Sequence, residues 1–510
     1  EVLPEAGVAC GGGGSGSVSF DTPQYDREAL YYSYPLDNQA DIAPDAPVVL
    51  SFSDPISLSE DNFTIQDGDG NDVPFQLSEV NDGQGVVLRP TQPLKVVTEY
   101  QVTMNDVETD SGTVDFPDGT LNFTTRAAFK GPADLQKTDP DFKIASIFPD
   151  DDTQFKTLDF SSFRLRTSHP LADQTAVYGE TVSLTHEGEL VPAVLLAKGN
   201  AITVDPLVDM TPGDQYQLSV TGLTSRFGET IEDFERTVTP LDTKSPTGKR
   251  ETLVTKVPPT DDTLGCLDPG VRLSELTGEP INCVPVIGTL LADQTSSKQS
   301  GNVFAELAFP PSFPDVTPLR VARGSILNGD ALDVIIGGQV PVGFDSGAVK
   351  VQIISDASGY LFPNPNSDSP NAPKNLRLFM DAATTTADAR ANGAFTQNLL
   401  HLELVGTAIV RDGILTTDAV TVVEPRVLGV DDSYGVLSFR MESYLDQENA
   451  PQPPVDSQSP ALLRFTGDNG PQRSCQPGDF TARMAPGDPL VLLFAVALDP
   501  RNLVTCSRRP

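Results

Sequence analysis

Apolar and polar residues alternate with a period of two along much of the chain. Val48, Leu50 and Phe52 are separated by small or polar residues, as are Phe163 and Leu165. This period predicts β-strands that bury one face. Strand-like runs continue in the second half of the chain, at 302–307, 331–336, 349–354, 400–405, 435–439 and 490–496. Only the Ala-rich stretch 381–400 predicts a helix.

Two stretches of the first half repeat the same order of landmarks. These are Pro55, Pro90, Leu94 and Tyr100 in the first stretch, and Pro170, Pro206, Met210 and Tyr216 in the second. The second proline and the tyrosine are ten residues apart in both stretches, and the spacing of the two prolines differs by one residue. A repeat of about 115 residues is too long for a solenoid unit, so it indicates duplicated domains with separate cores.

The opening and the closing strand of the first stretch carry recognisable motifs. A proline-led segment rich in Asp and small residues, 35–44, precedes a strand that ends in Phe-Ser-Asp-Pro-Ile at 52–56, and 119–125 forms the last strand. These motifs resemble the bacterial Ig-like domains of surface-layer and secreted proteins. The second stretch matches less well, because Thr167 stands where the first has Phe52. The resemblance implies a spacer, an adhesion stalk or an accessory module, and it specifies fold more strongly than function.

We therefore predict an all-β fold, with tandem immunoglobulin-like Greek-key β-sandwiches followed by one or two further β-sandwich domains. Residues 18–34 hold four of the ten tyrosines. This segment either covers the edge of the first sandwich or offers a strand to a partner. The predicted divisions are a Gly-rich tether at 1–17, the Tyr-rich segment at 18–34, Ig-like domains at 35–128 and 140–242, a linker at 243–262, a β-sandwich domain at 263–450 and a C-terminal β segment at 451–510.

Composition places the protein outside the cell and away from nucleic acid. The net charge of −37 and the sequence pI near 4.2 oppose binding to phosphates or to an anionic membrane surface. No apolar run reaches the roughly 18 residues that a transmembrane helix needs. We expect an extracellular or outer cell-surface protein.

Five cysteines refine this expectation. Cys266 with Cys283, and Cys475 with Cys506, are paired by proximity as disulfides, since no nearby histidines or CxxC pairs suggest zinc. Cys10 is left over, and its small preceding residues and Gly/Ser-rich continuation resemble the start of a mature bacterial lipoprotein. A lipid anchor at Cys10 would then be the only membrane contact. Gly7 and the acidic Glu1 and Glu5 depart from that pattern, so a plain tail with a free cysteine stays open.

Two further sets of residues are candidate sites. Asp67, Asp69, Asn71 and Asp72 alternate oxygen donors as in a calcium loop, although the turn glycine and the closing Glu of an EF-hand are missing. A plain hairpin turn is the alternative, and calcium is the one cofactor considered. Tyr100 and Tyr216 open alternating strands, where they are either domain-corner tyrosines or ordinary strand tyrosines.

Catalytic motifs are missing from the sequence. The three histidines, His169, His186 and His401, lie in no hydrolase or zinc-protease pattern, and no P-loop occurs. We expect a non-catalytic surface scaffold that mediates adhesion or assembly with other surface proteins, or with copies of itself. The alternative is a carbohydrate- or ligand-binding protein that uses the C-terminal sandwich, where Tyr360, Tyr434 and Tyr444 would replace the absent tryptophan.

Overall fold

The computed structural model is built from β-sheets whose strands are mostly antiparallel, which confirms the all-β prediction. Short 3-10 helices lie between strands, at Glu60–Asn62, Asn81–Gly83, Asp173–Thr175 and Pro310–Ser312. Among the described residues no helix is long and apolar enough to cross a membrane. The structure describes residues 29–110, 112–114, 119–127, 137–258, 263–286, 295–336, 342–364, 372–389, 395–397, 399–411, 414–424, 426–427 and 435–451.

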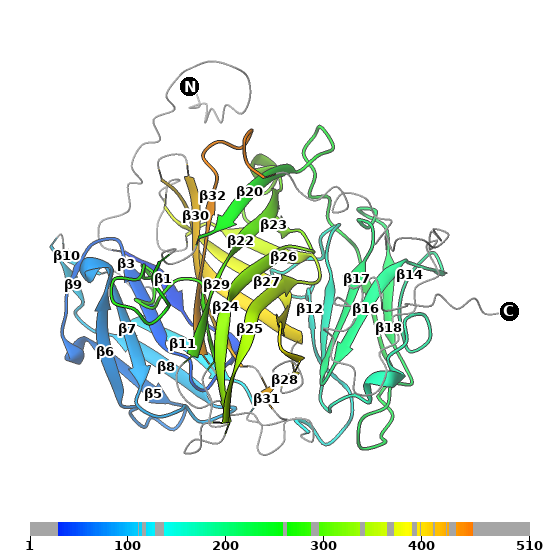
Figure 1. Cartoon of the computed structure of the whole chain (residues 1–510), viewed down its shortest axis with the longest axis horizontal. Coiled ribbons are helices and arrows are strands. Elements are labelled where there is room, and N and C mark those ends of the chain that lie inside the picture. Colours follow the sequence, from blue (N-terminus) through cyan, green and yellow to red (C-terminus); the bar gives the residue numbers. More distant parts are fainter. Residues whose placement is uncertain are drawn as a thin grey trace.

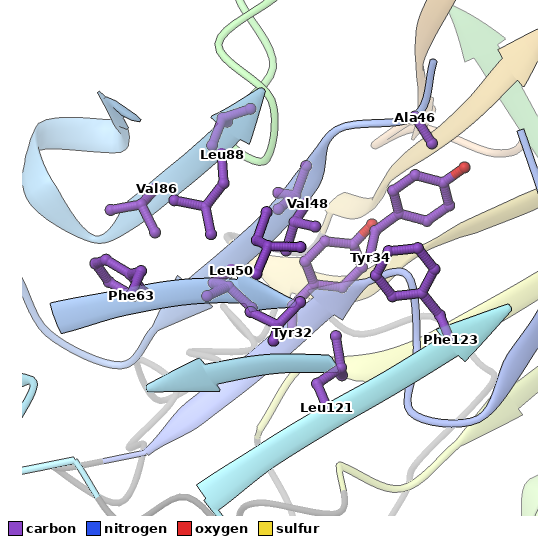
Figure 2. Close-up of a cluster of buried hydrophobic side chains, with 14 of the residues drawn as sticks. Tyr32, Tyr34, Ala46, Val48, Leu50, Phe63, Val86, Leu88, Leu121 and Phe123 are labelled. Carbon is purple, nitrogen blue, oxygen red and sulfur yellow. The ribbon is translucent and has the colours of Figure 1, made fainter. Parts of the chain in front are cut away.

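The first sandwich packs two four-stranded sheets face to face. One sheet has the order β1 (Leu30–Tyr34), β3 (Val48–Phe52), β7 (Gly85–Pro90) and β6 (Phe75–Val80). The other has the order β2 (Gln39–Ile42), β11 (Thr120–Thr125), β8 (Glu99–Met104) and β5 (Phe63–Asp67). Short strands β4 (Ile56–Ser57), β9 (Glu108–Thr109) and β10 (Gly112–Thr113) lie at one end. Figure 2 shows the shared core, in which Leu50 and Leu88 of one sheet face Phe63 and Phe123 of the other.

The second sandwich repeats the strand order of the first in one sheet and for three strands of the other. Its first sheet runs β12 (Ile144–Phe148), β13 (Phe163–Thr167), β17 (Ala201–Pro206) and β16 (Ala193–Lys198). Its second runs β15 (Glu189–Leu190), β14 (Val182–His186), β18 (Tyr216–Val220) and β19 (Phe234–Val238). Thr167, which replaces Phe52 of the first repeat, is buried and donates a 2.7 Å hydrogen bond to the carbonyl oxygen of His169. A satisfied hydroxyl can therefore occupy this core position.

The remaining strands form one sheet that closes on itself. Its strands are β20 (Glu251–Val257), β21 (Cys283–Val286), β22 (Thr295–Leu307), β23 (Thr317–Val321), β24 (Ile326–Ile336), β25 (Val342–Ile353), β26 (Ala357–Phe362), β27 (Lys374–Thr386), β29 (Leu399–Arg411), β30 (Ile414–Val423) and β32 (Gly435–Ser443). Closure follows because β20 pairs with both β22 and β32. If β20 with β21, β23 with β24, and β25 with β26 are each counted as one interrupted strand, eight antiparallel strands surround a single interior. A separate pair, β28 (Phe395–Gln397) and β31 (Arg426–Val427), lies outside this ring.

The structure differs from the sequence-based expectation in three places. The third unit is one closed sheet, whereas a two-sheet sandwich was expected for 263–450. The expected linker 243–262 contains β20, because Leu253, Thr255 and Val257 face the interior of that sheet. Residues 381–386 of the expected Ala-rich helix belong to β27, since small side chains also suit the crowded interior of a closed sheet.

The closed sheet lies between the two sandwiches (Figure 1). The first sandwich, in blue, is on one side and the second, in cyan and green, is on the other. The tandem repeat is therefore folded back around a central unit, and the two Ig-like domains do not form an extended pair.

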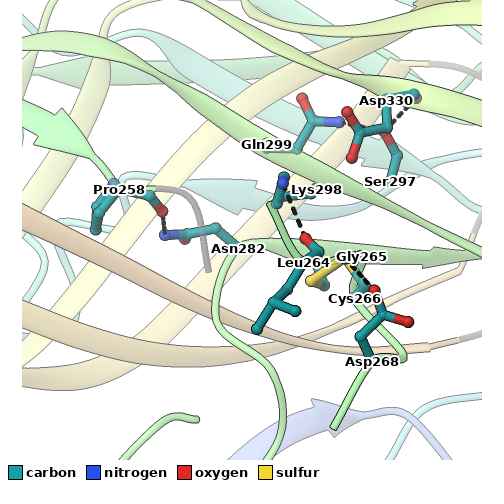
Figure 3. The surroundings of a disulfide bond; sticks show 11 residues. Pro258, Leu264, Gly265, Cys266, Asp268, Asn282, Ser297, Lys298, Gln299 and Asp330 are labelled. Atoms are coloured by element: carbon teal, nitrogen blue, oxygen red, sulfur yellow. Dashed lines mark hydrogen bonds between the residues drawn. A yellow bond between two sulfur atoms is a disulfide. The ribbon is translucent and has the colours of Figure 1, made fainter. Parts of the chain in front are cut away.

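A long excursion interrupts one strand of the ring. The chain leaves the sheet after β20 and returns at β21, which pairs with the same neighbour, β22. A disulfide between Cys266 and Cys283, with Cα atoms 5.9 Å apart, ties the excursion to its return point (Figure 3). Leu276, in the middle of the excursion, packs into the core of the first sandwich. The excursion therefore links the closed sheet to that sandwich.

Candidate functional site

The inner face of the closed sheet is apolar. Side chains alternate between the two faces of each strand, and the residues that point inward form one core cluster. In β27, for example, Leu376, Leu378 and Met380 point inward, while Arg377 and Phe379 point outward. The buried members of this cluster are Val257, Val303, Ala305, Leu319, Val321, Leu327, Ile353, Ala357, Leu361, Leu376, Leu378, Met380, Leu404, Ala408, Ala419, Val423, Leu437, Phe439 and Met441.

This apolar interior reaches solvent at the ends of the ring. Leu253, Leu307 and Leu415 are half-buried and pack against the inner cluster at one end, and Leu400 and Leu402 do so at the other. At the first end, Val410 is the cross-strand partner of Leu415 and is 41% exposed. The interior of an eight-stranded closed sheet is wide enough either to be filled by side chains or to hold one small ligand.

The first sandwich covers part of the outer face. The hydroxyl of Tyr32 donates a 3.0 Å hydrogen bond to the carbonyl oxygen of Val405 in β29. Val405 and Val420, which point outward, belong to the core cluster of this sandwich. Arg126 forms a two-pronged ion pair with Glu424 beside this contact. Tyr32 lies next to Tyr34 in Figure 2, so the tyrosine-rich strand β1 connects the two units.

Buried charges join the second sandwich to the opposite part of the outer face. Arg164 lies 3.1 Å from Asp381 of β27, and both side chains are almost fully buried. Arg323 lies 2.9 Å from Asp205, which also accepts a 2.7 Å hydrogen bond from Ser162. Burial raises the pKa of Asp205 to about 6 despite the neighbouring Arg323. If either partner of such a pair moved away, the other would be left as an unpaired buried charge, which is strongly unfavourable. These pairs therefore favour one docking geometry of the two units.

A second part of this contact centres on two more arginines. Arg250 reaches Asp209 at 2.7 Å, Glu306 at 3.1 Å and Asp159 at 3.3 Å. Arg320 pairs with Asp356, whose burial alone would raise its pKa; Arg320 and Arg323 outweigh that effect and hold the pKa below its usual value. Aromatic rings from both units complete the contact, with Phe148 and Phe379 stacked at 3.7 Å, and Phe155, Tyr360 and Phe362 around them.

This charged contact contains a hydroxyl, an imidazole and a carboxylate, but their geometry does not suit nucleophilic catalysis. The Nε2 atom of His401 lies 3.0 Å from Thr203 Oγ1 and 3.3 Å from Asp381 Oδ1. In a catalytic triad the hydroxyl and the carboxylate contact different ring nitrogens, whereas here both contact the same one. Burial also lowers the pKa of His401 to about 4. The arrangement is therefore a neutral hydrogen-bonded part of the domain contact.

Ring nitrogens of the other two histidines also contact polar groups of the protein. His169 is fully buried, with Nδ1 2.7 Å from Glu229 and Nε2 2.8 Å from the carbonyl oxygen of Asp139. His186 stacks on Tyr216 with ring centroids 4.6 Å apart, and its Nε2 lies 3.2 Å from Asp214. Neither lies beside a serine or cysteine nucleophile in these contacts.

The two candidate corner tyrosines make the same contact. The backbone N–H of Lys95 donates a 2.7 Å hydrogen bond to the hydroxyl of Tyr100, and the N–H of Thr211 donates a 2.8 Å bond to the hydroxyl of Tyr216. In both repeats the donor lies five residues before the tyrosine. Both rings are buried, and each hydroxyl joins a strand to the loop that precedes it.

The oxygen donors of the 67–72 loop are engaged within the protein. Asp67 is buried and accepts hydrogen bonds from the N–H groups of Asp69 and Asn71, while its other oxygen lies 2.5 Å from Nζ of Lys95. These hydrogen bonds, first among them that from Lys95, hold the pKa of Asp67 well below its usual range. Asp72 accepts a 2.9 Å bond from Gln66. Over the part of the chain that the structure describes, no group of three His, Cys, Asp or Glu residues could hold a metal. A calcium ion would have to displace Lys95, and calcium binding here stays a prediction.

The remaining predicted residues have varied positions. Tyr360 is buried in the contact with the second sandwich and donates to the carbonyl oxygen of Lys156, so it cannot stack on a sugar. The hydroxyl of Tyr444 donates to Asn302 at 2.8 Å. Tyr434, Cys10, Cys475 and Cys506 lie outside the described residues. The inner face and the outer-face contacts were not predicted from the sequence, because alternation shows which residues share a face but not which strands meet.

Comparison with known proteins identifies part of the chain directly. Residues 29–125 match the family model of the bacterial Ig-like domain. The range includes strand β1 and ends with β11, and therefore covers the first sandwich.

A curated relative matches nearly the whole chain. It is the alkane uptake protein B of Marinobacter nauticus, 34% identical over 541 aligned residues, which cover 97% of this chain and 49% of the relative. The chain thus spans about half the length of the curated relative that it matches.

Solved structures show only remote likeness. An L,D-transpeptidase from Mycobacterium tuberculosis H37Rv is 14% identical over 41% of this chain and 80% of its own, with a TM-score of 0.15. The surface-layer protein rSbsC(31-844) is 13% identical over 79% of this chain and 62% of its own, also with a TM-score of 0.15. At this level the likeness carries no argument about function.

Proposed function

We propose that this chain is a non-catalytic accessory protein of hydrocarbon uptake at the bacterial cell surface, and that the closed sheet binds an aliphatic chain against its inner face. One observation carries the proposal. The inner face is an apolar cluster whose half-buried members, together with exposed Val410, reach the rims of the ring. Burial of a hydrocarbon against such residues is favourable by about 25 cal/mol per Å² of apolar surface.

The two sandwiches then have a supporting role. They pack on the outer face through Tyr32 and Arg126 on one side and through Arg164, Arg250 and Arg323 on the other. Since both sandwiches pack on the outer face, a ligand of the closed sheet would enter from an end of the ring. A frame of this kind agrees with the spacer and accessory roles of bacterial Ig-like domains.

The comparisons support the same proposal. The name of the matched relative assigns it to alkane uptake, and the Ig-like domain favours a location outside the cytoplasm. Attachment to the membrane through Cys10, and assembly with other surface proteins, belong to this proposal as expectations. A role in adhesion, which the resemblance to bacterial Ig-like domains implies, also stays an expectation.

Fluorescence displacement tests the proposal. A naphthylamine probe that brightens in apolar surroundings should bind the purified chain and be displaced by n-hexadecane. The substitution Val410→Lys places an ammonium group at the inner rim and should weaken binding roughly tenfold, because a charge opposes burial of a hydrocarbon beside it. Thr416→Lys, next to Leu415 but on the outer face beside Glu442, is the matched control. The proposal is wrong if the probe does not bind or if both lysines weaken binding equally.

A further inference from the structure

A buried glutamine lies among the side chains of the inner face. Gln299 of β22 is 2% exposed and has the same orientation as Val303 and Ala305, which lie in the inner cluster. Its cross-strand partner is Gly329. A Cβ atom on Gly329 would lie only 1.9 Å from Nε2 of Gln299, so the glutamine occupies the space above that glycine.

The orientation of the Gln299 amide follows from its partners. The hydroxyl of Ser297 donates a 2.7 Å hydrogen bond to the carbonyl oxygen of Asp330, which can only accept. Ser297 has no second proton to donate, so it accepts a 2.9 Å bond from Nε2 of Gln299. Figure 3 shows these three residues together, while Lys298 points toward Leu264 near the disulfide.

Oε1 of Gln299 is buried and accepts no hydrogen bond from the residues that the structure describes. A buried carbonyl oxygen without a donor is unfavourable, because the hydrogen bonds that it loses with water are not replaced. The next residue of β22 on the same face as Gln299 is Gly301, which pairs with Val257 of the inner cluster. Oε1 of Gln299 therefore lies at the edge of the apolar cluster.

We infer that the closed sheet prefers aliphatic compounds with a terminal hydroxyl over plain alkanes, and that the ligand hydroxyl donates its hydrogen bond to Oε1 of Gln299. This inference rests on the proposed function and names the ligand class within it. An acceptor recognises O–H donors and disfavours carboxylates, which only accept. Long-chain primary alcohols therefore fit the site, and the ionised fatty acids do not.

Competition against the naphthylamine probe distinguishes the ligands. With the unmodified chain, hexadecan-1-ol should displace the probe roughly threefold to tenfold more effectively than n-hexadecane, the range expected for one net hydrogen bond. The methyl ether 1-methoxyhexadecane keeps the oxygen but has no donor, so it should behave like the alkane. Equal displacement by alcohol and ether would overturn the inference without any substitution.

Two matched variants locate the effect. Gln299→Met keeps the volume of the side chain and removes the acceptor, so the preference for the alcohol should disappear while the alkane binds as before. Thr417→Val removes another unpartnered buried hydroxyl from the inner face and should keep the preference. A preference that survives in Gln299→Met, or that is lost in Thr417→Val, would overturn the assignment to Gln299. If no compound displaces the probe, the proposed function itself fails; if only the preference is absent, the proposed function stands.

Discussion

The side-chain amide of Asn282 hydrogen-bonds both backbone groups of Arg440. Its Oδ1 accepts a 2.8 Å bond from the N–H of Arg440, and its Nδ2 donates 3.0 and 2.8 Å bonds to the carbonyl oxygens of Arg440 and Pro258. Asn282 lies where the excursion returns to the sheet. Its side chain therefore replaces a peptide group of the interrupted strand and continues the hydrogen bonding to β32 across the gap between β20 and β21.

Replacement of Asn282 by alanine should destabilise the protein strongly, because it leaves buried backbone groups of Arg440 and Pro258 without partners. Asn282 also has a positive φ of 54°, which asparagine tolerates better than alanine. Asn38, in an exposed turn with φ 60°, controls for this backbone effect. Urea unfolding should show that Asn282→Ala lowers the free energy of unfolding by at least about 2 kcal/mol more than Asn38→Ala. Equal losses would mean that only the backbone conformation matters.

The two corner tyrosines should be energetically equivalent. Tyr100→Phe and Tyr216→Phe each remove one hydroxyl that accepts a bond from a backbone N–H, so each should lower stability by about 1 kcal/mol. The amide protons of Lys95 and Thr211 should then exchange faster with solvent, each only in the variant of its own repeat. Unchanged exchange at both amides would show that the hydroxyls do not hold the loops.

The disulfide should stabilise the excursion. Cys266 and Cys283 are 17 residues apart in the sequence, and a loop of that size is worth about 3 kcal/mol in the chain-entropy model. A reductant should lower the Tm of the unmodified chain more than that of the double variant Cys266→Ser/Cys283→Ser, which keeps only the predicted Cys475–Cys506 bridge. An equal loss of Tm in both proteins would contradict a stabilising role for the Cys266–Cys283 disulfide.

Protonation of His401 should oppose folding in acid. Burial lowers its pKa to about 4, whereas the unfolded chain takes up this proton below about pH 6.5. The stability that this group contributes is complete above pH 6.5 and is lost as the pH falls toward 4, by up to about 3 kcal/mol. His401→Gln should therefore gain stability relative to the unmodified chain over this range.

The effect of His401 has to be measured as the difference in the free energy of unfolding between the unmodified chain and His401→Gln. Burial raises the pKa of Asp205 and of Asp418 to about 6, which makes the folded state more stable as the pH falls from 6 to 4, the opposite direction. Urea unfolding of both proteins at pH 7 and pH 4.5 cancels these shared contributions. His186→Gln, in the second sandwich, controls for the loss of an imidazole elsewhere. A difference that does not change with pH would contradict the assignment to His401.

Much of the two sandwiches could be predicted from the sequence because local signals agreed. The proline and tyrosine spacings mark equivalent strand ends, and Leu94 and Met210 are both buried as their repeat positions require. The family match over residues 29–125 confirms this part.

The closed sheet could not be predicted in the same way. Alternation in β27, for example, defines an inner and an outer face but does not show that β20 pairs with β32, about 180 residues later in the chain. The Ala-rich start of the expected helix was misleading because alanine propensity is a weak local preference that long-range pairing overrides. Gln299 and Asn282 have no sequence signal, since their roles depend on which strands lie beside them.

The ring can form only after β32, its last strand along the chain, has been made. The ring closes where β20, which ends at Val257, pairs with β32, which begins at Gly435. Beside β32, β21 and Asn282 continue the strand that the excursion interrupts after β20. Each sandwich is built from strands that are near one another in the chain, and such contacts form early. The ring must wait for its last strand, and until then its apolar inner side is an open sheet. The order of synthesis therefore leaves this apolar face exposed until β32 has been made, which makes ring closure the step at which aggregation competes with folding.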